Sequence, residues 1–349
     1  MTTLAVLTAQ QRAERARLEA DAAARLVTAY GQAWDAISRD LRALTDAIEQ
    51  AQARGETIDA AWLAKERRYR ALLDQVEAQI NGLAVQAGPL VRQQQAAAIA
   101  AAASHAEALA RAALGPPPPG VVVAWDRVPV EALQQLVGAL GDGQPLGTLL
   151  STFGPDARAA TSEALTTALV RGQSPRIAAK ALEAAVEGLG RNRALRLARS
   201  SMLDAYRDST LAAYRQNDVI TAYKRIAAHG PRTCLACLAL DGKIYPLGQD
   251  FGRHASCRCA LTPVVRSWAE LGYPGIPDVP QPETGPDWFD RQPEATQRQM
   301  IPVGAWEPFQ RGEIALSDFV EEGRNQWGPF TVQRPLRDVL RGIEAVAAD

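Results

Sequence analysis

The chain has 349 residues and a formal net charge of −1, with 38 basic and 39 acidic side chains. This length predicts about two or three domains, and the charge balance excludes a globally basic protein that wraps nucleic acid. No apolar run is long enough to predict a transmembrane helix, and residues 1–26 lack the order of regions found in a signal peptide. We therefore expect synthesis and folding in a cytoplasm, with no membrane partner.

Residues 1–114 are rich in alanine and contain a single proline, Pro89, so the composition favours helix. Apolar side chains recur at spacings of three and four along a predicted seam: Trp34, Ile37, Leu41, Leu44 and Ile48. Gly55 predicts a break, Thr57 a cap for a second helix, and Gly88 with Pro89 a further break before a third helix. We predict an α-helical hairpin or bundle, which serves either as an interaction arm or only packs on itself.

A run of four prolines follows this block at residues 116–119. Such a run is stiff and extended, so residues 115–128 are predicted to be a linker. Beyond the linker, Ser174 and Pro175 predict the start of one helix, and residues 192–216 predict a longer one. Four arginines crowd the start of the longer helix and either contact phosphate or form a solvated face paired with acids such as Asp204 and Asp208: Arg191, Arg193, Arg196 and Arg199.

Residues 219–226 are rich in β-branched side chains and predict a strand, which leads into a segment that holds all four cysteines. Asp241 and Gly242 within this segment predict a hairpin. The fold class is therefore mainly α, with a small β element that resembles a zinc ribbon.

The cysteines follow the pattern C-x2-C, a gap of 19 residues and C-x-C, with His254 three residues before the third cysteine. Clustered cysteines in a cytosolic chain favour a metal site over a disulfide scaffold, and the spacing is typical of zinc ribbons. The predicted zinc ligands are Cys234, Cys237, Cys257 and Cys259, with His254 as an alternative ligand. Either set is closed and tetrahedral, which indicates a structural zinc ion. Two disulfides or four free thiols are the alternatives.

The order of these motifs resembles the head-morphogenesis domain of the phage Mu F-like minor head protein family. The matching segments are Arg199-Ser200-Ser201, Arg232-Thr233-Cys234-Leu235-Ala236-Cys237, Leu240-Asp241-Gly242 and His254-Ala255-Ser256-Cys257-Arg258-Cys259. The sequence departs from the family pattern at Ser201, at Gly230-Pro231 and at Ala255, and none of these departures removes a sulfur. The resemblance assigns residues 129–265 to this domain.

The resemblance implies a minor head protein of a tailed bacteriophage or prophage, located in the virion head and in the host cytoplasm during assembly. It implies association with the portal protein, with scaffold or major capsid protein and phage DNA as further partners, and a role in head assembly, DNA packaging or DNA delivery. No catalytic activity and no small-molecule substrate come with it. The alternatives are a zinc-ribbon nucleic-acid-binding protein and a treble-clef nuclease, for which only His229 and His254 lie near the cysteines.

Residues 266–349 form a C-terminal extension with ten prolines between Pro274 and Pro335. It also carries many aromatic side chains, namely Trp268, Trp288, Trp306, Trp327, Phe289, Phe309, Phe319 and Phe330. This mixture predicts short helices and extended segments pinned by aromatic residues. The extension either lies against a partner or packs as a small unit on its own chain.

Overall fold

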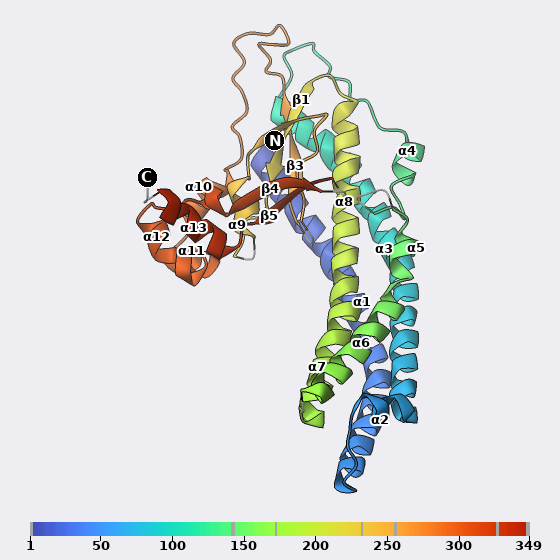
Figure 1. Ribbon diagram of the computed structural model, residues 1–349. Coiled ribbons are helices and arrows are strands. Elements are labelled where there is room, and N and C mark those ends of the chain that lie inside the picture. Colours follow the sequence, from blue (N-terminus) through green and yellow to red (C-terminus); the bar gives the residue numbers. More distant parts are fainter. Residues whose placement is uncertain are drawn as a thin grey trace. The chain divides into compact units, whose positions relative to one another are not determined.

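The computed structural model describes residues 3–140, 144–171, 173–231, 233–254, 257–325 and 328–346 (Figure 1). The chain is mainly helical and contains a three-stranded and a two-stranded antiparallel sheet, which confirms the predicted fold class. Within the described ranges, none of the helices combines the length and apolar character that crossing a bilayer requires.

The chain forms two compact units. We call residues 17–96 and 137–202 the helical unit, and residues 1–16, 97–136 and 203–349 the cysteine unit. Three helices pass from one unit into the other: α1 (Leu4–Ala53), α3 (Arg67–Leu114) and α8 (Arg193–Arg215). The predicted domains, residues 1–114, 115–128, 129–265 and 266–349, are continuous segments, whereas each compact unit combines several segments of the chain. The predicted division stays a prediction.

The helical unit buries the apolar seam predicted for the first helix. Ile37, Leu41, Leu44 and Ile48 of α1 are buried in one cluster with apolar side chains of α3, and Trp34 is partly buried against it. Each such side chain contributes about 1.5–3 kcal/mol by leaving water. The remaining elements of this unit are α2 (Ala60–Lys65), α5 (Leu146–Leu150), α6 (Phe153–Val170), α7 (Pro175–Glu187), the π-helical turn η1 (Gly188–Asn192) and the first part of α8.

Two predicted helix boundaries in this unit are wrong. The second helix is capped by Asp59 rather than Thr57, because the Asp59 carboxylate accepts a hydrogen bond of 2.7 Å from the Trp62 backbone N–H. The break expected at Pro89 does not occur, and α3 continues through it. A proline there removes one backbone hydrogen bond, but Ala87 and Val91 on either side are fully buried in the same core. Their packing outweighs the missing bond.

The cysteine unit is built around a three-stranded sheet of order β2-β1-β3, with β1 (Ile220–Ile226), β2 (Ile244–Pro246) and β3 (Ala260–Val265). The strand predicted over residues 219–226 is β1, and the helix predicted over 192–216 is α8. The unit also contains α4 (Val130–Gln134) and the short helix α9 (Leu235–Ala239).

The turn predicted at Asp241 and Gly242 is present, with φ +91° at Gly242, but it does not join two paired strands directly. It follows α9 and leads into β2, which then pairs with β1. The Gly242 backbone N–H donates to the Arg225 carbonyl at 2.8 Å, so the turn is held against β1. The hairpin prediction missed the helix inserted between the two strands.

The second half of the predicted linker is anchored to the cysteine unit. The Asn217 side chain at the end of α8 donates to the Asp126 carbonyl at 3.1 Å and accepts from the Asp126 backbone N–H at 3.0 Å. Trp125 packs against the core of this unit, and the guanidinium of Arg111 lies 5.2 Å from the centre of its ring. This part of the linker is therefore fixed to α8 and α3.

The C-terminal extension packs on its own chain. Its elements are α10 (Gly285–Asp290), α11 (Glu294–Met300), η2 (Val303–Ala305), α12 (Trp306–Gln310), η3 (Leu316–Phe319), β4 (Val320–Asn325), β5 (Gly328–Gln333) and α13 (Leu336–Val346). Phe289, Trp306 and Phe319 are buried in one cluster with Leu235 and Leu238 of α9. The short helices confirm the prediction, whereas the β4–β5 hairpin was not expected, and Trp327 lies outside the described residues.

The contact between this extension and α9 is tight enough to require a glycine. A Cβ atom at Gly285 would lie 2.3 Å from the Leu238 carbonyl oxygen. This distance is a steric clash, and a backbone oxygen cannot move away as the end of a flexible side chain can. We expect Gly285→Ala to lower the free energy of unfolding by about 1–3 kcal/mol, measured by urea denaturation followed by tryptophan fluorescence. Gly248→Ala is the control, because a Cβ there meets nothing within 4 Å. Equal unfolding midpoints for the two variants would contradict this packing.

Candidate metal centre

The five predicted ligands come together in the cysteine unit. Cys234 caps the N-terminus of α9, and its sulfur accepts a hydrogen bond of 3.3 Å from the Cys237 backbone N–H. The cap and the first turn of a helix place these two cysteines on one side. Cys257 and Cys259 lie just before β3, and His254 lies in the loop that leads to them. None of these four cysteines forms a disulfide.

The donor atoms form two overlapping groups that share Cys237. One group is Cys234, Cys237 and His254, the other is Cys237, Cys257 and Cys259, and the donors within each group lie within 4.8 Å of one another. The His254 Nε2 atom is 3.4 Å from the Cys234 sulfur and 3.1 Å from the Cys237 sulfur. The Cys237 and Cys257 sulfurs are 3.9 Å apart. Cys237, Cys257 and Cys259 are buried, whereas Cys234 is partly exposed.

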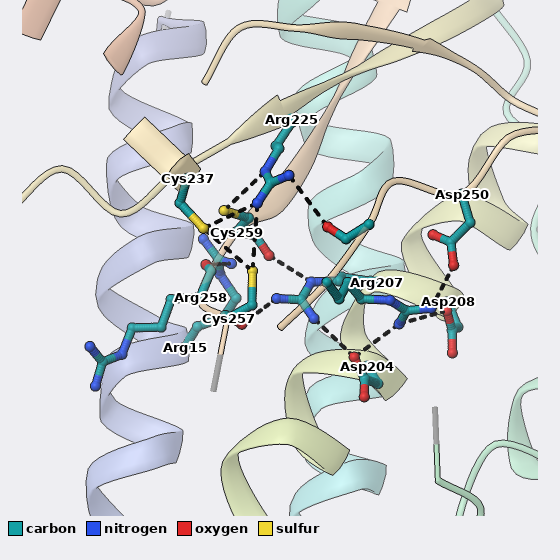
Figure 2. A network of polar contacts seen from close by, with 12 residues as sticks. Arg15, Asp204, Arg207, Asp208, Arg225, Cys237, Asp250, Cys257, Arg258 and Cys259 are labelled. Carbon is teal, nitrogen blue, oxygen red and sulfur yellow. Dashed lines mark hydrogen bonds and ion pairs between the residues drawn. The ribbon is translucent and has the colours of Figure 1, made fainter. Parts of the chain in front are cut away.

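A fully buried arginine on β1 points its guanidinium at these sulfurs (Figure 2). The Arg225 Nε atom is 3.3 Å from the Cys259 sulfur, and a terminal nitrogen is 3.1 Å from the Cys237 sulfur and 4.0 Å from the Cys257 sulfur. The other terminal nitrogen donates to the Gly252 carbonyl at 3.4 Å and to the Thr331 hydroxyl at 3.5 Å. No carboxylate is among the acceptors that Arg225 finds in the described residues.

This arrangement requires negative charge on the sulfurs. A buried guanidinium is costly unless an anion compensates it, and thiolates are the anions within reach. Burial lowers the pKa of Arg225, but the charges of Cys259, Cys237 and Cys257 more than offset this and raise the pKa above its ordinary value. Hydrogen bonding with Cys237 lowers the pKa of the Cys257 thiol well below its ordinary value, which gives this sulfur the thiolate character that a metal requires. Hydrogen bonds with Cys234, Cys257 and Cys259 raise the pKa of the Cys237 thiol, so without a metal the negative charge is shared unequally among the sulfurs.

The pKa values of Cys234 and His254, at the partly exposed end of the cluster, both shift in favour of the charged form. Hydrogen bonding with Cys237, together with that from the His254 ring, lowers the pKa of the Cys234 thiol to about 5, although burial opposes the shift. Hydrogen bonds with Cys234 and Cys257 raise the pKa of His254 to about 10. Both shifts favour a thiolate at Cys234 beside an imidazolium at His254 when no metal is bound.

A second buried arginine, Arg207 of α8, holds the backbone of the C-x-C segment. Its side chain donates to the Cys259 carbonyl at 2.7 Å and to the Cys257 carbonyl. Its remaining nitrogen pairs with Asp204 at 2.9 Å. Arg15 of α1 adds a hydrogen bond of 3.1 Å to the Arg258 carbonyl. Two helices therefore fix the loop that presents the last two sulfurs.

Three carboxylates pair with a further arginine, Arg253, and one of them also pairs with Arg207. Arg253 pairs with Asp204 at 2.9 Å, with Asp250 at 2.6 Å and with Asp208 at 3.8 Å. Burial raises the pKa of Asp208 to about 6, and Arg253 opposes the shift. Asp204 and Asp208 therefore pair with Arg207 and Arg253 rather than with the earlier arginines of α8.

The arginine run that could have contacted phosphate is mostly used in ion pairs within the helical unit. Arg191 pairs with Glu187 at 2.5 Å. Arg193 pairs with Asp156 at 2.5 Å, and Arg199 pairs with Glu19 at 2.6 Å. The structure favours the solvated, acid-paired face over the phosphate site.

Of the two histidines that the nuclease alternative invoked, His254 lies among the cysteines and His229 belongs to neither donor group. His229 pairs with the buried carboxylate of Asp241, and its ring stacks on Trp288 with the ring centres 5.3 Å apart. Asp241 also accepts from the Ala227 backbone N–H at 2.9 Å. This group connects β1, the turn before β2 and α10, and it has a structural role.

Sequence reasoning missed Arg225 and Arg207. One signal was available for Arg225: it alternates with Tyr223 along a β-branched strand, so both lie on the buried face of β1. An arginine at an inward-facing strand position beside four cysteines indicates a buried anion. Arg232, Ala255 and Ser256 of the recognised motifs lie outside the described residues.

The donor set fits a zinc ion. Thiolate and imidazole donors are those that zinc prefers, and tetrahedral bond lengths of ~2.1 Å to nitrogen and ~2.3 Å to sulfur place neighbouring donors roughly 3.5–3.8 Å apart. The observed separations of 3.1, 3.4 and 3.9 Å lie close to that range. The five donors exceed the four that a closed tetrahedral site needs.

Comparison with known proteins identifies one family. Residues 160–262 match the family model described as "Phage Mu protein F like protein". No curated protein and no solved structure matches the chain. The matched range begins within α6 and ends within β3, so it contains all five donors together with Arg207 and Arg225. The family resemblance of the sequence is confirmed.

Because Cys237 belongs to both donor groups, its substitution should abolish metal binding. We expect the full chain, purified under reducing conditions, to carry about one zinc ion, and Cys237→Ser to carry none. Thr221→Ser, an exposed substitution on β1, is the control and should keep the metal. The measurement is elemental analysis of the purified proteins. A wild-type chain without zinc would overturn the assignment of a metal centre.

Proposed function

We propose, from the membership of residues 160–262 in the phage Mu protein F-like family, that this chain is a minor head protein of a tailed phage or prophage. The family implies a phage head-morphogenesis protein and a place in the virion head. Our proposal adds association with the portal, a role in head assembly, DNA packaging or DNA delivery, and residence in the host cytoplasm during assembly. The family match over α8 and the cysteine-bearing sheet is the observation that carries it.

In this proposal the cysteine cluster holds a structural zinc ion. When bound, zinc supplies folding free energy, with apparent values of about 10–16 kcal/mol in small zinc domains. Cys234 and Cys237 would connect α9 to Cys257 in the segment before β3, so that a sheet of three short strands gains a cross-link. Arg225 offsets the charge of the thiolates, and Arg207 holds the backbone that carries the last two of them.

The chain acts, in this proposal, without catalysis. A closed tetrahedral site keeps no coordination position for water, and five donors are at hand to close it. Neither of the other two histidines is placed as a base at the cysteines, because His229 pairs with Asp241 and His105 pairs with Glu14 at 2.9 Å. These contacts favour an assembly role over the treble-clef nuclease.

The N-terminal helical arm is the better of the two candidate surfaces for the portal. The aromatic extension was the other candidate, but its largest side chains are buried against α9 and are not available to a partner. In the helical unit, Val85 of α3 is 74% exposed and Val27 of α1 is 39% exposed. Exposed apolar residues on paired helices suit helix packing against a second protein.

Co-expression with the portal protein encoded in the same genome tests this proposal. We expect the full chain to co-purify with the portal, and Val85→Glu to weaken the complex by about tenfold, or ~1.4 kcal/mol. Val303→Glu in the extension is the matched control, because Val303 is 93% exposed and its change leaves the core intact.

A chain that stays free of its portal and is missing from purified particles would contradict the head-protein assignment. Salt-dependent DNA binding in that case would favour the zinc-ribbon nucleic-acid binder instead. Equal portal binding by the Val85→Glu and Val303→Glu variants would contradict the proposed surface.

A further inference from the structure

The metal centre offers five donors for four positions, so one of them lies outside the coordination shell. The sequence leaves two sets open, four thiolates or three thiolates with His254. The contacts of the His254 ring and of the Cys259 sulfur differ enough to choose between them.

His254 contacts three of the four cysteines. Its Nε2 atom lies 3.4 Å from the Cys234 sulfur and 3.1 Å from the Cys237 sulfur, and its ring also hydrogen-bonds with Cys257. Two of these three sulfurs share a donor group with His254, and Cys257 is linked to that group through Cys237. The expected nitrogen–sulfur edge of a tetrahedral zinc site is about 3.6 Å, and its sulfur–sulfur edge is about 3.8 Å. The distance of 3.9 Å between Cys237 and Cys257 agrees with the second value.

The Cys259 sulfur is grouped with those of Cys237 and Cys257, and two arginines contact this residue. Its sulfur accepts from Arg225 Nε at 3.3 Å, and its carbonyl accepts from Arg207 at 2.7 Å. The next residue, Ala260, is already paired with Ile226 in the sheet. Both arginines also contact Cys257, so the difference between the two cysteines is one of position: Cys259 directly precedes the paired strand, whereas Cys257 lies nearer to the loop that carries His254 and hydrogen-bonds with its ring.

We propose that the metal ligands are Cys234, Cys237, His254 and Cys257, and that Cys259 is a fifth sulfur outside the ligand set, held by Arg225. This assignment rests on the proposed metal centre and specifies it. It gives a site with three sulfurs and one nitrogen. Arg225 becomes a positioning residue, because it holds Cys259 and also donates to the ligand Cys237 at 3.1 Å.

The sulfur count of the bound zinc tests the assignment without any substitution. X-ray absorption at the zinc edge of the full chain should give three sulfur neighbours and one nitrogen. Cadmium-113 NMR of the cadmium-loaded chain should show coupling between the metal and the His254 ring. Four sulfurs and no coupling to His254 would overturn the assignment while leaving the metal centre and the head-protein proposal intact. A chain that binds neither metal would overturn the metal centre itself.

Substitution of the two sulfurs of the C-x-C segment gives an independent comparison. We expect Cys259→Ser to keep one zinc per chain with an affinity within about tenfold of wild type, because a hydroxyl can replace the sulfur as acceptor for Arg225. Cys257→Ser is the matched control and should lose at least about a hundredfold, since it removes a ligand. The readout is zinc affinity by competition with a chelator. Loss of zinc from a Cys259→Ser chain whose circular dichroism is unchanged would overturn the proposal.

Discussion

The buried charge of Arg225 is the constraint on which the cysteine unit depends. A guanidinium inside a protein core needs an anion, and this one finds sulfurs within 3.1–4.0 Å. The requirement connects β1, which carries the arginine, with α9 and the segment before β3, which carry the thiolates. Arg207 complements the contact by binding the Cys257 and Cys259 carbonyls, so the loop that presents these sulfurs is held by backbone as well as by side chain.

The C-terminal extension completes the surroundings of the same charge. The Thr331 hydroxyl of β5 accepts a hydrogen bond from Arg225. The backbone of Phe330 lies so close to Gly252 that a Cβ atom on Gly252 would be 2.4 Å from the Phe330 carbonyl carbon. Gln333 accepts from the Leu235 backbone N–H at 3.1 Å, which adds a contact at the start of α9. The extension is therefore part of the cysteine unit. Its removal would expose Leu235 and Leu238 and uncover one side of Arg225. We therefore expect deletion of residues 266–349 to disturb the three-stranded sheet.

Local patterns in the sequence predicted the helical seam, β1, α7, α8 and the grouping of the cysteines with His254. These features follow from periodicity, capping and ligand spacing, which act over a few residues. The continuity of α3 through Pro89 was missed, because it depends on burial of Ala87 and Val91 against distant segments. The roles of Arg207 and Arg225 were missed for the same reason: each is defined by partners 12 to 106 residues away. The burial of the aromatic extension likewise depends on how it packs against α9, and amino-acid composition does not predict such a contact.

We infer that the charge of Arg225 is matched to metal-binding thiolates, and the zinc affinity of an Arg225→Met chain tests this inference most directly. Substitution of a residue that hydrogen-bonds metal ligands commonly weakens metal binding by 10–100-fold, and removal of one partner from a buried charge pair is strongly destabilising. Chelator competition should therefore give an affinity about 10–100-fold below wild type. Arg291→Met, which removes an exposed arginine paired with Glu283, should leave the affinity unchanged. A wild-type affinity in a folded Arg225→Met chain would contradict the account.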